Sequence, residues 1–222
     1  MKRLLVLLLV LITAPVAYPF QKEEDVLRKM EATGKTLKSL SATIWQQKTN
    51  TQIGIQDPPE SGNLYYVPAK GGKMRLRIDI AKPAKTIVVN GDEVKFYQPE
   101  IRQVLLTSIK SASKNQSVAS LAITFGSVAA IRSNYNVAFV KEETLNGEPT
   151  VLLLLTPKTQ GAYKKIELWV SQKQWMPVQQ RLVESNDDVI VIKITNLKPN
   201  SQFDAAKLID SFNPPNVKVV KG

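Results

Sequence analysis

The sequence predicts a mainly β protein of the α+β type, in which one curved antiparallel sheet carries helices that line or plug the space it encloses. Several segments alternate strictly between apolar and polar residues, as a strand buried on one side does. The dipeptide Asn90-Gly91, a strong hairpin signal, joins two such segments. Short strands that follow one another in this way form a meander, and a long meander curls toward a barrel.

The chain opens with the basic pair Lys2 and Arg3, an apolar stretch from Leu4 to Ile12 and a short run of small residues. This pattern is typical of a secretory signal peptide, and the apolar stretch is too short to cross a bilayer comfortably. We therefore expect residues 1–20 to be a leader that is cut near Ala17. Residues 21–222, which contain no repeat or linker, should form a single domain.

The mature chain should begin with an amphipathic helix over residues 21–33, because Val26, Leu27 and Met30 share one face and Gly34 follows. From Leu37 the apolar period changes to two, which predicts a strand that ends in a turn over residues 56–63. Strands and hairpins then follow over residues 74–80, 85–98 and 100–106.

Residues 115–135 interrupt the strands with apolar positions near helical spacing, among them Leu121 and Phe125. The remaining surface of this predicted helix is small, so it can be enclosed inside the sheet, and Ser117 could cap its start. Further strands are expected over residues 136–143, 151–157, 164–171, 176–185 and 188–197, followed by a short helix and an extended tail after Pro214-Pro215.

The composition excludes most catalytic chemistry. The 222 residues contain no His and no Cys, so histidine-assisted nucleophiles, thiols, disulfides and most zinc sites are absent. The acidic pairs Glu23/Glu24, Glu142/Glu143 and Asp187/Asp188 fall at a helix start or in turns, where carboxylates are ordinarily solvated. We expect neither an enzyme nor a cofactor.

The apolar face of the predicted sheet is either plain core or the wall of a ligand cavity, since curved sheets of this size are known to enclose ligands. The run from Val151 to Leu155 is apolar on both faces, so one side of it is core and the other is covered by a loop or exposed for contact. The candidate cavity residues are Trp45, Met74, Leu76, Ile78, Ile87, Val89, Phe96, Leu121, Phe125, Leu152, Leu154, Leu168 and Ile192.

The net charge is strongly positive, at +11, and loss of Lys2 and Arg3 with the leader would reduce it by two to +9. Between Lys70 and Lys114 ten basic residues stand against four acidic ones. These charges either form a solvated outer face or dock an acidic partner or membrane; export argues against nucleic acid. The candidate docking residues are Lys73, Arg75, Arg77, Lys82 and Lys85.

Three segments, taken in order, are similar to a known family. They are "GNLYYVPAKGGKMRLRI" (62–78), "KPAKTIVVNGDEVKFYQPEIRQV" (82–104) and the closing "F…PPNVKVV" (212–220). In this order they resemble the LolA-type carriers of outer-membrane lipoproteins, and the match covers most of the exported chain. One departure stands out: the carriers place an Arg before the Pro of the first strand pair, to tie the barrel to its lid, where this chain has Val67 before Pro68.

The resemblance implies a periplasmic monomer with an unclosed β-barrel and a helical lid. It implies an acylated lipoprotein or lipid as cargo, an inner-membrane ABC-type exporter as donor and an outer-membrane acceptor. The alternative is a periplasmic sensor or regulatory module, built on a similar curved sheet, that binds a lipid or protein signal without transporting it.

Overall fold

The computed structural model contains one large sheet and a few short helices, and it describes residues 19–68, 74–112 and 123–222. The strands are β1 (Leu40–Asn50), β2 (Ile55–Gln56), β3 (Glu60–Pro68), β4 (Met74–Ile80), β5 (Lys85–Asn90), β6 (Glu93–Gln98), β7 (Gln103–Ser108), β8 (Tyr135–Leu145), β9 (Glu148–Pro157), β10 (Tyr163–Ser171), β11 (Pro177–Glu184), β12 (Val189–Pro199) and β13 (Lys218–Lys221). The helical segments are α1 (Pro19–Thr36), the 3-10 helix η2 (Pro99–Ile101), α2 (Ile109–Ala112), α4 (Val128–Asn134) and the π-helix η3 (Ala206–Asp210).

The strands lie side by side in the order β13-β7-β6-β5-β4-β3-β1-β12-β11-β10-β9-β8, with β2 paired to β1 outside this path. The two end strands, β13 and β8, do not pair with each other, so the sheet stays open. The predicted fold class, a mainly β protein with an unclosed curved sheet, is therefore confirmed. The pairing is antiparallel except at one end, where β13 runs parallel to β7, a pairing that the sequence did not predict.

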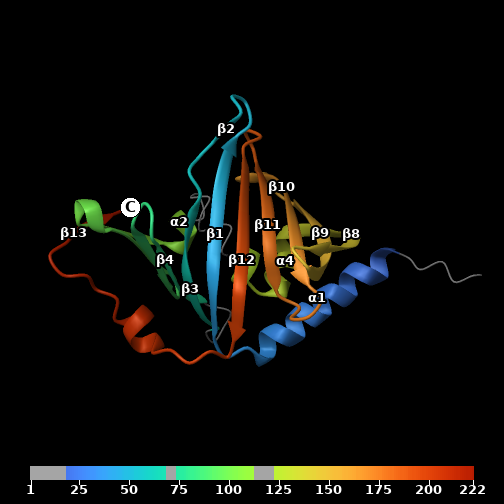
Figure 1. Cartoon of the computed structure of the whole chain (residues 1–222), viewed down its shortest axis with the longest axis horizontal. Helices are drawn as coiled ribbons and strands as arrows, with labels where there is room; N and C mark the ends of the chain where they lie inside the picture. Colours follow the sequence, from blue (N-terminus) through green and yellow to red (C-terminus); the bar gives the residue numbers. More distant parts are fainter. Residues whose placement is uncertain (1–18, 69–73, 113–122) are drawn as a thin grey trace, which may run out of the picture.

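Two meanders are joined by one pair of strands in the centre of the sheet. The first meander runs from β1 to β7 and the second from β8 to β12. Apart from β2, which pairs only with β1, strands that follow one another in sequence within a meander also pair in the sheet. Strands β1 and β12 connect them, pairing from Leu40 with Pro199 to Thr49 with Val189. Figure 1 shows the pair as a blue strand beside an orange one.

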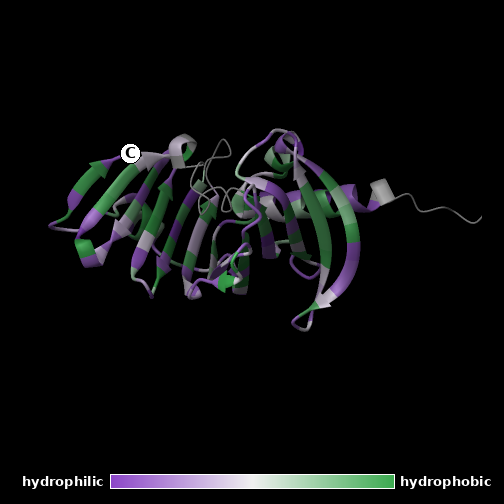
Figure 2. Cartoon of the chain, turned by 90° about the horizontal axis from the view of Figure 1, so that it is seen from above, coloured by the Kyte–Doolittle hydropathy of each residue, from purple (hydrophilic) through white to green (hydrophobic). Residues whose placement is uncertain are grey.

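The alternating residues form strands because one side of the sheet is buried. In β4 the burial alternates at every position: Met74, Leu76, Ile78 and Ile80 are buried and the residues between them are half-buried. Hydrophobic and hydrophilic residues alternate along many of the strands in Figure 2. The predicted hairpin is also confirmed: β5 and β6 are joined at Gly91, whose φ of 62° suits glycine.

Helices α1 and α4 pack on one face of the sheet, which we call the inner face. Val26, Leu27 and Met30 of α1 share a hydrophobic core with apolar residues of the strands. The helix predicted over residues 115–135 is interrupted: residues 123–125 are helical, Gly126 and Ser127 are not, and α4 follows. The Ser127 hydroxyl caps α4 by accepting a hydrogen bond of 3.1 Å from the Ala130 amide, whereas the predicted cap Ser117 lies outside the described residues.

The C-terminal segment covers part of the opposite, outer face. Helix η3 contacts β4 and β5, with Ile209 only 1% exposed. Its Asp210 pairs with Arg75 of β4, and Arg77 donates a hydrogen bond of 3.0 Å to the Leu208 carbonyl. Farther along, the Phe212 ring stands edge-on to Tyr97 of β6. The predicted short helix and extended tail thus form a strap across the outer face.

Gly62 lies where two strands approach each other too closely for a side chain. The sequence placed it in a turn, but it belongs to β3, opposite Ile80 of β4. A Cβ at this position would lie 1.8 Å from the Asp79 carbonyl oxygen and 2.9 Å from the Ile80 Cα. The contact is with backbone, so it cannot be relieved by a change of rotamer.

We expect Gly62→Ala to lower the free energy of unfolding by about 2 kcal/mol, because the strands must separate to admit the methyl group. Urea denaturation measures the change. Gly34→Ala is the matched control: no atom lies within 4 Å of its added Cβ, and alanine favours helix α1 by up to about 1 kcal/mol. Equal stability of the two variants would contradict the assigned contact.

Candidate functional site

The inner face is a continuous apolar surface to which nearly every strand contributes. Leu40, Ile44, Leu64, Val94, Leu153, Ile166 and Leu182 are among its buried residues. Nine of the predicted cavity residues lie on this face: Met74, Leu76, Ile78, Ile87, Val89, Phe96, Phe125, Leu168 and Ile192. Eight of them are less than 9% exposed, and Phe96 is half-buried against the same cluster. The structure therefore brings these nine side chains together.

Three predicted cavity residues lie on the outer face instead. Trp45 alternates with buried Ile44, and the Lys193 ammonium lies 4.6 Å from the centre of its ring. In β9 the inward residues are Val151, Leu153 and Leu155, so Leu152 and Leu154 point outward. The phase of this strand could not be set from the sequence because its run is apolar at every position. Leu121 lies outside the described residues.

An apolar pocket of about 380 Å³ opens beside the helical segment that precedes α4. Its wall includes Met30, Gly34, Tyr66, Pro68, Phe125 and Val128. The Tyr66 and Phe125 rings lie 4.9 Å apart, and the Tyr66 hydroxyl donates a hydrogen bond of 3.3 Å to the Phe125 carbonyl. Burial raises the pKa of Tyr66, so its hydroxyl keeps the proton it donates. Tyr66 immediately precedes Val67, at the place where the sequence lacks an Arg.

The inner face becomes polar at one end, near the turn after β1. Gln46 and Lys48 continue the inward-facing column of Leu40, Ala42 and Ile44. Gln46 donates a hydrogen bond of 2.5 Å to Glu60, which also forms an ion pair of 2.6 Å with Lys85. The space on this face is thus apolar through most of its length and charged at one end.

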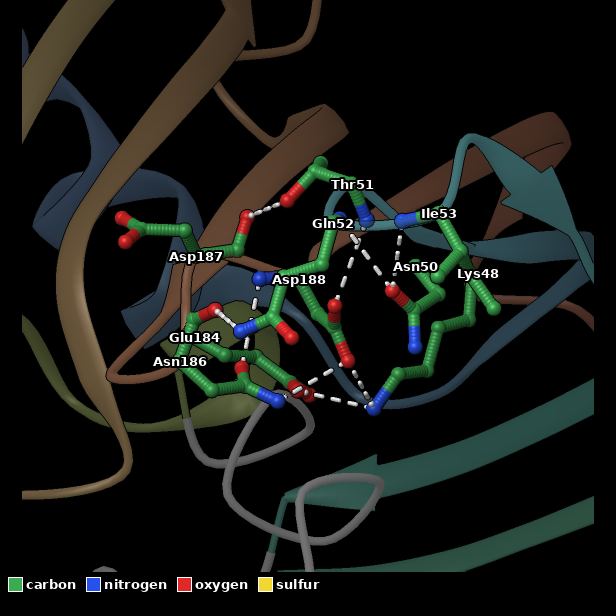
Figure 3. A network of polar contacts seen from close by, with 9 residues as sticks. All are labelled: Lys48, Asn50, Thr51, Gln52, Ile53, Glu184, Asn186, Asp187 and Asp188. Atoms are coloured by element: carbon green, nitrogen blue, oxygen red, sulfur yellow. Dashed lines mark hydrogen bonds and ion pairs between the residues drawn. The ribbon is translucent and has the colours of Figure 1, made fainter.

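Lys48 is the centre of a partly buried polar network at this end (Figure 3). Its ammonium donates to Glu184 at 2.8 Å and lies 3.3 Å from an Asp188 oxygen. The Asn186 amide donates to Asp188 at 2.9 Å, and the Thr51 backbone amide donates to it at 3.3 Å. The network ties the turn after β1 to the turn between β11 and β12.

Glu184 and Asp188 of this network are buried, contrary to the expectation for Asp188, whereas Asp187 is exposed as expected. Glu184 is 1% exposed and Asp188 is 4% exposed. Desolvation acts to raise the pKa of Asp188, but hydrogen bonds from Asn186 and Lys48 outweigh it and hold that pKa below its ordinary value. Desolvation likewise acts to lower the pKa of Lys48, and its bonds to Glu184 and Asp188 reverse the sign and raise it.

The predicted docking residues do not form an open basic patch. Arg75 is paired with Asp210, Arg77 with Asp79 at 2.8 Å, and Lys85 with Glu60 on the inner face. Lys82 is exposed in the turn between β4 and β5. Lys73 lies outside the described residues. The alternation of β4 was interpreted correctly, but the strap that covers its outer face comes from more than 130 residues along the chain.

A second, larger pocket of about 680 Å³ lies between α1 and the rim of β8 and β9. Most of its wall is charged, with ion pairs such as Lys29 with Asp25 at 2.8 Å. Such a wall is unsuited to an apolar ligand. Among the residues that the structure describes, no three His, Cys, Asp or Glu side chains are placed to hold a metal ion. None of the described helices has the length and apolar character that crossing a membrane requires.

The comparisons with known proteins agree with this geometry. A family model described as "Outer membrane lipoprotein carrier protein LolA" matches residues 35–208. No curated protein matches the chain by sequence.

Several solved structures are similar in fold, all at low sequence identity. An uncharacterized conserved protein from Thermus thermophilus is 14% identical, with 91% of this chain and 100% of that chain covered and a TM-score of 0.61. A DUF1329 family protein from Desulfovibrio piger is 15% identical, with 87% and 98% covered and a TM-score of 0.54. The MucA/MucB complex of Pseudomonas aeruginosa contains a chain that is 15% identical, with 90% and 63% covered and a TM-score of 0.53.

Proposed function

The chain belongs to the LolA family of outer-membrane lipoprotein carriers, and from this we propose that it is a periplasmic carrier that holds the acyl chains of lipoproteins or related lipids against its inner face. The observation that carries the proposal is the continuous apolar inner face, together with the short helical segment around Phe125 that packs over it. An acyl chain needs the first feature for shelter from water and the second for entry. Binding and release need no bond to be broken, so the proposal assigns no catalytic residue.

The energetics favour a site that is occupied by the protein's own helix when empty. Burial of each CH₂ group contributes about 0.8 kcal/mol, so a 16-carbon chain gains on the order of 12 kcal/mol before any cost is subtracted. A carrier that kept all of this could not release its cargo. Displacement of the segment that contains Phe125 exposes apolar surface and so offsets part of the gain.

We expect the purified protein to bind a fluorescent 16-carbon acyl probe with a Kd on the order of 1 μM. Unlabelled fatty acids should displace the probe, and their affinity should rise by about fourfold for each added CH₂ group within the length that the face accommodates. Displacement titrations with 10-, 12- and 14-carbon acids measure this slope. Affinities that do not depend on chain length would reject an acyl site.

Transport between membranes is the finer part of the proposal. We propose that residues 1–20 direct export, that an inner-membrane ABC-type exporter loads the monomer, and that an outer-membrane acceptor unloads it. Arg75, Arg77 and Lys85 are engaged within the chain, so docking would use other surfaces. Mass spectrometry of lipids that co-purify from the periplasm would identify the cargo.

Regulation is the second candidate, and the similarity to MucB in its complex with MucA favours it. In this reading the same sheet senses a lipid or a protein and transfers nothing. Transfer of a bound lipoprotein to acceptor vesicles separates the two functions, because a carrier releases its cargo and a sensor retains it.

A further inference from the structure

One polar side chain stands within the apolar inner face. Gln180 of β11 is fully buried, at 0% exposure, and pairs across the sheet with Leu168 on one side and Ile192 on the other. Both neighbours are buried apolar residues of the core. A leucine or methionine at this position would satisfy the packing without any polar atom, so packing alone does not explain the glutamine.

The hydrogen bonds of Gln180 are only half made. Its amide nitrogen donates to the Thr124 hydroxyl, in the helical segment that covers the inner face. Its carboxamide oxygen is buried and has no hydrogen-bond partner among the described residues. A buried acceptor without a donor is costly and calls for an explanation, and a ligand that supplies the missing bond is one.

Thr124 is adjacent to Phe125. The segment that must move to admit an acyl chain is therefore the same one that is hydrogen-bonded to Gln180. Once this segment leaves, both the nitrogen and the oxygen of the carboxamide face the incoming ligand. The buried oxygen needs a donor, and an amide in the cargo supplies one with its N–H. An ester offers only the carbonyl.

Building on the proposed carrier function, we propose that Gln180 selects amide-linked acyl chains. Its oxygen accepts a hydrogen bond from the amide N–H of the cargo. Glu184 follows Gln180 and Leu182 in the same inward column of β11, and it also has a buried oxygen without a partner among the described residues. It lies at the charged end of the face. The polar head of the cargo therefore points toward Lys48 and Glu184, and its acyl tail toward the apolar remainder.

Two ligands that differ in one atom group test this selectivity. N-palmitoylglycine methyl ester and palmitoyl glycolate methyl ester are alike except that the first has an N–H where the second has an ester oxygen. We expect the wild type to bind the amide about tenfold more tightly, the factor that one neutral hydrogen bond typically supplies. Competition of each ligand against a fluorescent acyl probe measures the ratio.

The substitution Gln180→Met removes the hydrogen bonds at similar volume and should reduce the ratio of affinities to about one. Thr124→Val is the matched control, because it removes the partner of Gln180 in the empty protein and leaves Gln180 itself in place. In that variant both ligands should bind more tightly while their ratio stays near the wild-type value.

A wild-type ratio near one overturns the assignment by itself, even if Gln180→Met does not fold. A wild-type preference that persists in a folded Gln180→Met protein also overturns it, since the selectivity then resides elsewhere. Failure to bind either ligand is a different outcome, which removes the proposed carrier function and the selectivity with it.

Discussion

The Phe125→Ala variant should unfold more easily and yet bind an acyl probe more tightly than the wild type. Its side chain is 8% exposed and packs on Tyr66 within the inner core, so its truncation should cost about 3 to 5 kcal/mol of folding free energy. If the segment around it covers the site in the empty protein, the same loss favours the open state. The apparent Kd should then fall by at least about tenfold, because a larger fraction of molecules is competent to bind.

Ile209→Ala is the matched control for this prediction. Ile209 is 1% exposed but belongs to η3 on the outer face, so its truncation costs about 2 to 5 kcal/mol without touching the inner face. Thermal unfolding and probe titration on both proteins separate the two effects. If the Phe125→Ala protein loses stability and binds the probe no better than Ile209→Ala does, Phe125 is an ordinary core residue. The hypothesis of a displaceable segment would then be rejected.

The second large effect should come from Lys48→Met. This change leaves the Glu184 carboxylate, which is 1% exposed, buried without its cation. Because Lys48 itself is only half-buried, breaking this pair should cost about 2 to 3 kcal/mol. The double variant Lys48→Met/Glu184→Leu removes both charges and should recover most of the loss, since replacing a whole buried pair by apolar residues is often neutral. A double variant as unstable as the single one would contradict a cost that arises from the orphaned charge.

The same network predicts a pH dependence with a definite sign. The pKa of Asp188 is below its ordinary value of 3.8 in the folded protein, so this group stabilises the fold above 3.8 and loses that contribution as the pH falls through the lowered pKa. The pKa of Lys48 is above its ordinary value of 10.5, so its contribution is complete below 10.5 and is lost at still higher pH. The difference in stability between wild type and Lys48→Met should therefore be largest between these limits and shrink outside them.

Much of the fold could be predicted because alternation and turn residues are local signals. Met74, Leu76 and Ile78 alternate with charged residues, which sets both the strand and its inward face. Val151 to Leu155 carry no alternation, and there the predicted phase was wrong by one residue. The fold class could be predicted from the sequence. Which residues of a strand face inward cannot be predicted when the run is buried on both faces, because that depends on what covers each side.

Less of the candidate site could be predicted, because it depends on contacts between segments that are distant in the sequence. The sequence around Arg75 and Arg77 contains no signal that residues 204–212 will cover these two side chains. The network of Lys48 with Glu184 joins positions 136 residues apart. Gln180 did carry a readable signal, since it alternates with Arg181 and shares the face of Leu182. A glutamine on an otherwise apolar face is unusual, so Gln180 should have been among the candidate site residues.

The central pairing of β1 with β12 has a consequence for the order in which the protein folds. Each meander closes neighbouring hairpins within a few tens of residues, but the strand pair that unites them joins Leu40 to Pro199. Closing so long a loop is slow, because its entropy cost must be met before the distant contacts can form. The sheet therefore cannot be completed until almost the whole chain has been synthesised, and we expect a growing chain to remain threadable through a narrow channel until its last strands emerge.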